Sequence, residues 1–258
     1  MTKPKVLVTG ASGLIGGLVL RELADRYEFS GLSRHAVAGI PYTQAPITDL
    51  VAVRRAVAGM DMVLHLAGET KNDDDWDDHF NVTAGGTINV LRAAADAGVR
   101  RVVVMSTGST MCGWEWDDSL PYGRLAAGER DLPAWDLLDY RTPPRPDSPY
   151  GAAKLFGEAA ARWFSDRTPM SVLVIRLGAV LAENRPTLIR HFPGFLAQED
   201  AVQMIDRCLS APDSVKYGIF DAISENSTRW RDTTPAKEVL GWEPTGSSDR
   251  FDPSELSR

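Results

Sequence analysis

The amino-acid sequence predicts an α/β fold in which helices cover both faces of a doubly wound parallel β-sheet. Short apolar runs recur along the chain, helical patterns separate them, and a glycine-rich turn joins the first run to the first helix. Strands that alternate with helices and read as nearly continuous apolar runs are typical of parallel sheets buried on both faces. These three observations together set the fold class.

Each predicted element has its own justification. The apolar runs place strands at 5–9, 28–33, 61–66, 101–106 and 171–176. Helical patterns cover about 14–26, 49–57, 91–97, 150–164, 199–209 and 234–241. Asp49 is a favoured N-cap and Gly59 a favoured helix end, while Pro235 and Gly241 bracket the last helix. Residues 107–148 are rich in Trp and Pro, and a loop of that length predicts a lid or a binding segment.

Composition excludes several classes of protein. The 258 residues are 43% hydrophobic and 24% charged, with a net charge of −7, and they contain no Lys/Arg run, so we expect no nucleic-acid partner. No apolar stretch is long enough for a membrane span, and glycines interrupt the first apolar segment, so we expect neither a membrane partner nor a signal peptide. A cytoplasmic location follows by default. The scattered His and Cys residues predict no metal site.

The glycine turn Gly10-Ala-Ser-Gly13-Leu-Ile-Gly16 lies directly between a strand and a helix. Glycines there allow a tight turn and let backbone N–H groups approach a pyrophosphate at the helix N-terminus. The pattern therefore predicts a Rossmann-type dinucleotide site; the alternative is a structural turn that binds nothing. The residues expected to surround the phosphates are Gly10, Ser12, Gly13, Leu14, Ile15 and Gly16.

Ser33 and Arg34 end the second predicted strand, where NAD-binding proteins usually have a carboxylate for the ribose. An arginine can pair with a 2′-phosphate, and a serine can donate a further hydrogen bond. The sequence therefore favours NADP over NAD, and the alternative is a solvated surface arginine.

Tyr150 and Lys154 are four residues apart at the start of a predicted helix, so they share one face. A nearby ammonium favours the phenolate of a tyrosine, which makes the pair suitable for proton transfer. Ser106-Thr107-Gly108-Ser109 follows the fourth strand, at the sheet edge where ligands bind. One of the hydroxyl groups of this strand end, which continues to Thr110, is therefore a candidate to contact the substrate hydroxyl.

With this site the sequence predicts three regions. Residues 1–176 would form the NAD(P)-binding core, with 107–148 as an inserted lid loop. Residues 177–246 would form a small substrate-binding region, and 247–258 a polar tail.

The chain resembles the short-chain dehydrogenase/reductase superfamily, in its extended epimerase/dehydratase-like branch. The resemblance rests on the glycine turn, His65-Leu66-Ala67-Gly68, Gly86-Thr87-Ile88-Asn89, the Ser106-Thr107 strand end and the Tyr150/Lys154 pair. Within that branch, Arg176-Leu-Gly178 and the stretch from Trp230 to Pro244 are most similar to uronate dehydrogenases.

The resemblance implies a role for each matching residue. Tyr150 would be the general base, Lys154 its electrostatic partner, and Thr107 the third catalytic residue. Arg176 would hold a substrate carboxylate, and Thr70, Gly108 and Ser109 would lie beside the substrate. The remaining cofactor contacts would be Ile47, Leu66, Ala67 and Gly68.

The chain also departs from uronate dehydrogenases. Gly108-Ser109 replaces an Asn-His pair, and Arg34 replaces the ribose-binding aspartate. Pro46 stands at the adenine-side aspartate, and Thr83 stands where the usual asparagine is expected, with Asn81 two residues earlier. The segment between Thr107 and Tyr150 is also longer than in that subfamily. These changes indicate a different substrate, so a uronate is one candidate among several.

The leading hypothesis is an NAD(P)-dependent oxidoreductase that moves hydride to or from a secondary alcohol or carbonyl of a small sugar-like or sugar-acid-like compound. One alternative is a nucleotide-sugar epimerase or dehydratase. That class normally has a larger C-terminal substrate region than the residues after Arg176 provide, which disfavours it. Another is a non-catalytic NAD(P)-binding regulator on the same fold. A homodimer is expected by analogy with the family.

Overall fold

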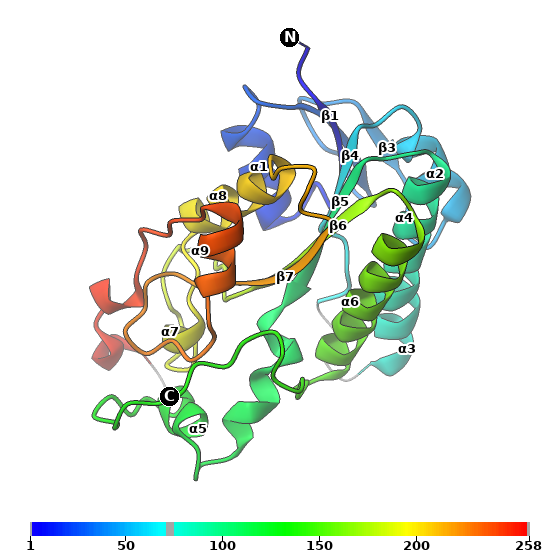
Figure 1. Cartoon of the computed structure of the whole chain (residues 1–258). Helices are drawn as coiled ribbons and strands as arrows, with labels where there is room; N and C mark the ends of the chain where they lie inside the picture. The colour runs from blue at the N-terminus through cyan, green and yellow to red at the C-terminus, as the bar shows by residue number, and fades with distance from the viewer. Residues whose placement is uncertain (1, 71–74, 257–258) are drawn as a thin grey trace.

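A computed structural model of the chain describes residues 2–70 and 75–256 (Figure 1). Its centre is a parallel sheet with the strand order β3-β2-β1-β4-β5-β6-β7. The strands are β1 (Lys5–Thr9), β2 (Glu28–Ser33), β3 (Tyr42–Gln44), β4 (Met62–His65), β5 (Arg101–Thr107), β6 (Ser171–Leu177) and β7 (Tyr217–Ala222). The strand order reverses between β1 and β4, which opens a crevice at the carboxyl ends of these strands.

Helices form a layer on each face of the sheet (Figure 1). The first layer contains α2 (Leu50–Val57), α4 (Gly85–Asp96) and α6 (Pro149–Arg167). The second contains α1 (Leu14–Glu22), α8 (Gln198–Leu209) and α9 (Thr234–Leu240). Apolar side chains alternate along the strands and fill both layers, so two apolar cores hold the sheet between them.

No helix in residues 2–70 and 75–256 has both the length and the apolar character that a membrane span requires.

The sequence predicted the central strands to within one residue at each end, and the α/β class is confirmed. It missed two edge strands. β3 has only three residues, and β7 contains Gly218 and Asp221, which interrupt its apolar run. The first helix ends at Glu22, before the predicted Arg26. Because β7 pairs with β6, the sheet continues into the stretch that the sequence assigned to the substrate region.

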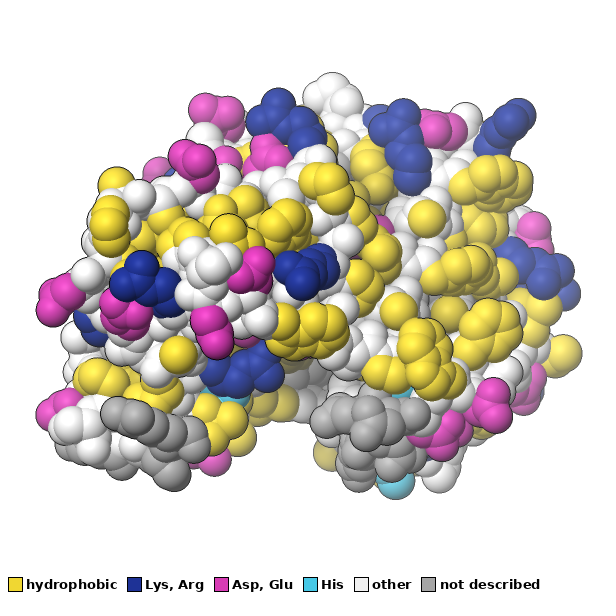
Figure 2. All heavy atoms as spheres, turned by 90° about the horizontal axis from the view of Figure 1, so that it is seen from below, with side chains coloured by type: hydrophobic (Ala, Val, Ile, Leu, Met, Phe, Trp, Pro, Cys, Tyr) yellow, Lys and Arg dark blue, Asp and Glu magenta, His cyan; other side chains and the backbone are white. Residues whose placement is uncertain are grey.

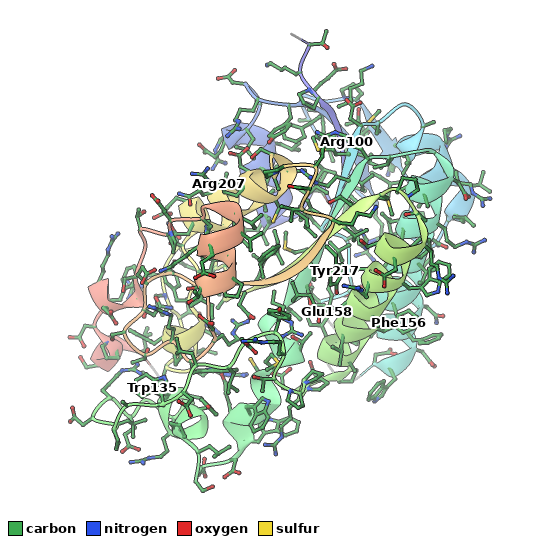
Figure 3. The ribbon with its side chains drawn as sticks, viewed as in Figure 1. Arg100, Trp135, Phe156, Glu158, Arg207 and Tyr217 are labelled. Atoms are coloured by element: carbon green, nitrogen blue, oxygen red, sulfur yellow. The ribbon has the colours of Figure 1, made fainter. Side chains whose placement is uncertain are left out.

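Residues 107–148 are more ordered than a simple loop. They contain η2 (Gly108–Thr110), η3 (Cys112–Trp116) and α5 (Pro121–Ala126), and they share a small apolar core with Trp230. Trp135, labelled in Figure 3, donates its indole N–H to the carbonyl of Arg229 at 3.0 Å, and Leu138 N–H bonds to the carbonyl of Trp230 at 2.8 Å. The segment is thus anchored to the C-terminal part of the chain.

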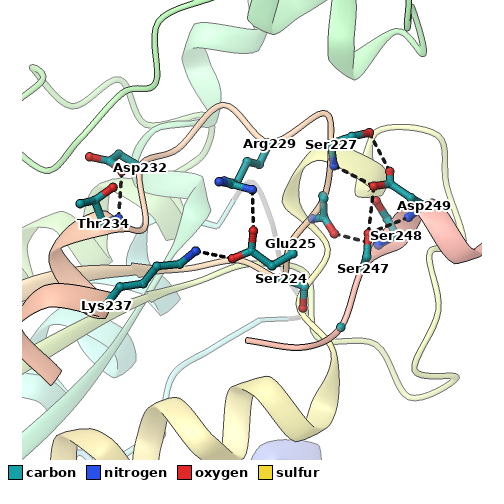
Figure 4. A network of polar contacts seen from close by, with 12 residues as sticks. Ser224, Glu225, Ser227, Arg229, Asp232, Thr234, Lys237, Ser247, Ser248 and Asp249 are labelled. Carbon is teal, nitrogen blue, oxygen red and sulfur yellow. Dashed lines mark hydrogen bonds and ion pairs between the residues drawn. The ribbon is translucent and has the colours of Figure 1, made fainter. Parts of the chain in front are cut away.

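The C-terminal part is held by ion pairs and short turns (Figure 4). Glu225 binds Arg229 at 3.0 Å and also binds Lys237 of α9. Ser227 N–H and its hydroxyl bond to the carboxylate of Asp249 at 2.9 and 2.8 Å. Glu225 thus ties the chain after β7 to α9, and Ser227 ties it to the turn around Asp249.

Candidate active site and nucleotide cleft

A cleft of about 510 Å³ lies at the carboxyl ends of the strands, where the strand order reverses. The sequence-predicted cofactor residues all lie along it: Gly10, Ser12, Gly13, Leu14, Ile15, Gly16, Ser33, Arg34, Ile47, Leu66, Ala67, Gly68, Tyr150 and Lys154. The predicted nucleotide turn and the predicted catalytic pair therefore face one cavity.

The glycine turn is shaped for close approach of the backbone. Gly10 has φ +71°, and a Cβ there would lie 2.9 Å from the backbone nitrogen of Ala67. A Cβ on Gly16 would lie 2.6 Å from the carbonyl oxygen of Ala11. No side chain caps the start of α1, so its first N–H groups point toward the cleft and are available to an anion. The turn therefore fits a dinucleotide pyrophosphate.

A buried chain of hydrogen bonds fixes the backbone of the cleft wall at Ala67. Burial, with a smaller effect of the Lys154 charge, lowers the pKa of His65 to about 3, so the imidazole is neutral. Thr87 donates to the carbonyl of Thr83 at 2.7 Å and therefore accepts from His65 Nε2 at 3.1 Å. His65 Nδ1 then accepts from Thr9 Oγ1 at 2.7 Å. Thr9 Oγ1 in turn receives the N–H of Ala67 at 3.3 Å, which fixes the backbone beside the cofactor.

Polar groups gather where β2 ends. The hydroxyls of Ser12 and Ser33 lie 2.6 Å apart, and Arg34 Nη1 is 3.8 Å from a carboxylate oxygen of Glu69. His35 also lines this part of the cleft. The arrangement offers a guanidinium and two hydroxyls to a group bound beyond the ribose.

The helix α6 presents Tyr150 and Lys154 to the cleft. Ser148 caps this helix by accepting the N–H of Gly151 at 3.1 Å, and Pro149 occupies its first turn. Lys154 Nζ lies 5.6 Å from the centre of the Tyr150 ring and donates to the carbonyl of Met105 at 2.8 Å. The two side chains are thus close together and held against the end of β5.

Burial dominates the electrostatics of this pair. It raises the pKa of the Tyr150 phenol to about 12 and lowers the pKa of the Lys154 ammonium to about 8. The sequence predicts that the ammonium favours the phenolate, but burial of the phenol outweighs that effect. At neutral pH the phenol therefore keeps its proton.

The predicted substrate residues divide into two groups. Thr70 and Thr107 line the cleft beside Tyr150, whereas Gly108, Ser109 and Arg176 do not. The backbone of Ser109 packs on α6, since a Cβ on Gly151 would lie 2.4 Å from the Ser109 carbonyl oxygen. Within the described part of the chain, the predicted lid segment beyond Thr107 contributes no residue to the cleft wall.

Arg176 has a partner inside the protein. Its Nε and Nη2 bond to the two carboxylate oxygens of Glu158 at 2.8 and 2.7 Å, and Ser106 Oγ donates to the same carboxylate at 2.6 Å. Arg176 is only 2% exposed, and Figure 3 shows Glu158 on α6. The contacts support an internal ion pair, and a role of Arg176 toward a substrate carboxylate stays a prediction without support from this geometry.

Sequence reasoning missed several residues of the cleft wall. Met105, Leu177, Gly178, Val180 and Val82 all line it. Leu177 is the last residue of β6 and Gly178 follows it, so their position at a strand end was the available signal. Val82 belongs to a π-helical turn, η1 (His79–Ala84), which has no sequence signature of its own.

The fold and the site define a dinucleotide-binding enzyme of the short-chain dehydrogenase type. A model of the NAD-dependent epimerase/dehydratase family matches residues 6–239. The chain therefore belongs to that family.

Named relatives agree with this assignment. The chain is 31% identical to an L-arabinose 1-dehydrogenase (NAD(P)(+)) of Haloferax volcanii, over 95% of this chain and 97% of the relative. It is 29% identical to a uronate dehydrogenase of Pseudomonas putida, over 96% and 86%. The crystal structure of uronate dehydrogenase from Agrobacterium tumefaciens has a TM-score of 0.83 at 26% identity, covering 100% of this chain and 91% of that one. A mutant of that enzyme is known in complex with NAD.

Burial of the Lys154 ammonium predicts that this residue lowers the stability of the fold although activity depends on it. Lowering the pKa of Lys154 from 10.5 to about 8 corresponds to a cost of up to about 3 kcal/mol for the charged form. Lys154→Met should therefore raise the free energy of unfolding at pH 7 by roughly 1–3 kcal/mol while abolishing activity. The gain should shrink as pH rises from about 8 toward 10.5, because the wild-type lysine then loses its charge.

Urea denaturation between pH 7 and 10 measures this difference, with the exposed Lys3→Met as the control. A Lys154→Met variant that is no more stable than the wild type at pH 7 contradicts the prediction.

Proposed function

We propose that the protein is an NAD(P)-dependent dehydrogenase that oxidises a secondary alcohol of a small sugar-like or sugar-acid-like substrate, or catalyses the reverse reduction. The observation that carries this proposal is the shared cleft: Tyr150 and Lys154 face the same cavity as the glycine turn. The names of the relatives, which include a sugar and a sugar-acid dehydrogenase, support the substrate class. A cytoplasmic location, where nicotinamide cofactors are available, is part of the proposal.

The proposed reaction moves a hydride and a proton from one alcohol group. A bound oxidised nicotinamide would supply the hydride acceptor and a positive charge that, together with Lys154, favours ionisation of the Tyr150 phenol. The Tyr150 phenolate then takes the hydroxyl proton and becomes a phenol again, while the C–O bond of the substrate becomes a carbonyl. Thr107 orients the hydroxyl, and Thr70 contacts the rest of the substrate. Sequestration in the cleft keeps the reacting groups aligned.

Replacing Tyr150 by Phe separates an enzyme from a non-catalytic regulator. Loss of one positioned proton acceptor should lower kcat by about 10²–10⁴-fold, while the glycine turn and Lys154 keep cofactor affinity within about threefold. Steady-state rates at the nicotinamide absorbance band and NADPH fluorescence titration measure the two effects. Tyr140→Phe, at an exposed tyrosine of the 107–148 segment, is the control. Full activity in Tyr150→Phe contradicts the proposed chemistry.

We further propose that NADP is preferred over NAD. The support is the cluster at the end of β2, where Ser12, Ser33 and Arg34 offer donors to a 2′-phosphate. Arg34 is 58% exposed in its side chain and is only loosely paired with Glu69. A 2′-phosphate can therefore engage the guanidinium without displacing a buried ion pair.

Arg34→Ala should raise KM for NADP by about tenfold, because one charge-assisted contact is lost. In the same variant, KM for NAD should change by less than about threefold. Arg54→Ala removes another exposed arginine, which lies on α2 and pairs with Asp96 away from the cleft, and serves as the control. Equal losses with both cofactors contradict a 2′-phosphate role.

We also propose that the protein forms a homodimer and that α6 lies in the interface. Phe156 and Trp163 are 47% and 57% exposed and lie two helical turns apart on the outer side of α6. Figure 3 places Phe156 on that outer side. Figure 2 shows further exposed hydrophobic side chains on the half of the lower face where α3 (Trp76–Asp78) and α6 lie.

Trp163→Glu should convert a dimer into a monomer, because a charge on a packed apolar interface is costly to bury. Sedimentation velocity measures the mass. Val239→Glu changes an exposed apolar residue of α9 and is the matched control. A wild-type protein that sediments as a monomer contradicts the proposal.

A further inference from the structure

A π-helical turn lies against the catalytic helix. The turn η1 (His79–Ala84) joins α3 to α4, and the N–H of Gly85 bonds to the carbonyl of Phe80, five residues earlier. Such turns are rare overall but occur frequently at functional sites. Because η1 packs on α6, the helix that carries Tyr150 and Lys154, it lies where it can support both of them.

The first residue of this turn contacts the catalytic tyrosine. The imidazole ring of His79 and the phenol ring of Tyr150 have centroids 5.7 Å apart and are tilted by 56°. His79 is 0% exposed, so the protein interior fixes the position of its ring. Tilted aromatic pairs at such distances attract each other by about 0.5–1.5 kcal/mol beyond the burial of their area. The contact therefore restricts the orientations open to the Tyr150 side chain.

Lys154 is another neighbour of the Tyr150 ring. Its Nζ lies 5.6 Å from the ring centre, but it belongs to the same helix, one turn further on. A contact within one helix sets the phenol relative to that helix. His79 belongs to a different helix, whose Val82 lines the cleft. The His79 contact therefore also sets the phenol relative to the cleft wall.

The same π-helical turn supports the segment beside the ammonium. Thr83 Oγ1 accepts the backbone N–H of Glu69 at 3.0 Å. A Cβ on Gly68 would lie 3.2 Å from Lys154 Nζ and 3.6 Å from Thr83 Oγ1, so the three groups are close neighbours. One end of η1 thus contacts the phenol, and the other end holds the backbone against which the ammonium packs.

The position of the phenol oxygen matters for the proposed reaction. Tyr150 and Thr107 line the same cleft, and both are proposed to act on one substrate hydroxyl. Proton transfer needs heavy atoms within about 2.6–3.2 Å of each other, and a misplacement of about 1 Å can lower the rate about 100-fold. A residue that limits rotation of the phenol can therefore contribute to kcat without contacting the substrate.

We propose that His79 is a positioning residue, which holds the Tyr150 phenol in the orientation for proton transfer through contact between the two rings. His79 lies outside the residues that line the cleft, so it acts through Tyr150. This inference rests on the proposed dehydrogenase function and adds a residue to its machinery.

The test removes the ring of His79 and leaves the residues of the cleft unchanged. His79→Leu should lower kcat by about 10–100-fold, because the phenol is no longer held in one orientation. KM for the cofactor should stay within about threefold of the wild type. His79→Phe keeps an aromatic ring at this place and should keep kcat within about threefold of the wild type.

Steady-state reduction of NADP or NAD by the whole protein measures these effects. The substrate is L-arabinose or D-galacturonate, whichever the wild type oxidises faster. His191→Leu, at a partly buried histidine of α7 (His191–Gly194) outside the cleft, is the matched control and should keep the kcat of the wild type.

A double variant separates an effect through Tyr150 from general damage to the site. His79→Leu added to Tyr150→Phe should change the residual rate by less than about threefold, because the proton acceptor that His79 holds is already absent. General damage would lower this residual rate as strongly as it lowers the rate of the wild type. Single-turnover measurements at high enzyme concentration give the residual rate.

Replacement of a buried polar side chain by an apolar one can destabilise the fold. His79→Gln keeps hydrogen-bonding atoms but loses the ring, and it should show the same loss of kcat as His79→Leu. Far-UV circular dichroism identifies which of the variants are folded.

A folded His79→Gln variant with the kcat of the wild type overturns the inference. So does a folded His79→Phe variant that is as slow as His79→Gln, or an equal loss of rate on adding His79→Leu to the wild type and to Tyr150→Phe. A folded wild type that binds NADPH but oxidises no sugar or sugar acid overturns the proposed function itself, and the inference with it.

Discussion

Buried charge at one end of the sheet is the constraint on which the functional half of the structure depends. Glu158, Arg176, Asp221 and Arg231 are all nearly inaccessible to water, and each would be costly to bury alone. Pairing makes their burial tolerable, but each pair fixes two segments at once: α6 to β6, and β7 to the stretch that follows it. The arrangement of the substrate end is therefore set by charge pairing as much as by apolar packing.

The nucleotide half was largely predictable because its chemistry is local in sequence. Gly16 is required by contact with the backbone of Ala11, and Tyr150 and Lys154 are one helical turn apart. Such short-range patterns survive in a single sequence, since the residues that act together are also close along the chain. The same reasoning explains why Asp49 and Gly241 marked helix ends correctly.

The substrate half was not predictable because its contacts join distant residues. Arg176 ends a strand, which suggested a ligand-binding arginine, yet its partner Glu158 stands 18 positions earlier on the catalytic helix. Arg231 carried no signal at all, since only the fold brings it onto Gly108 across more than a hundred residues. The glycine at 108 looked like the loss of a polar contact, whereas in the structure it is the space that an arginine from another segment fills. The Trp-rich segment 107–148 was similarly ambiguous, because its tryptophans anchor it to Trp230 and its neighbours.

Substitutions in the nucleotide half and in the substrate half of the structure therefore have different consequences. The cofactor and proton-transfer groups are coupled through Lys154, which contacts the carbonyl of Met105 and lies near Tyr150 and Gly68, so an alteration there disturbs binding and chemistry together. The charge pairs of Glu158 with Arg176 and of Asp221 with Arg231 lie outside the residues that line the cleft, so they act on the cleft only through the segments that they fix.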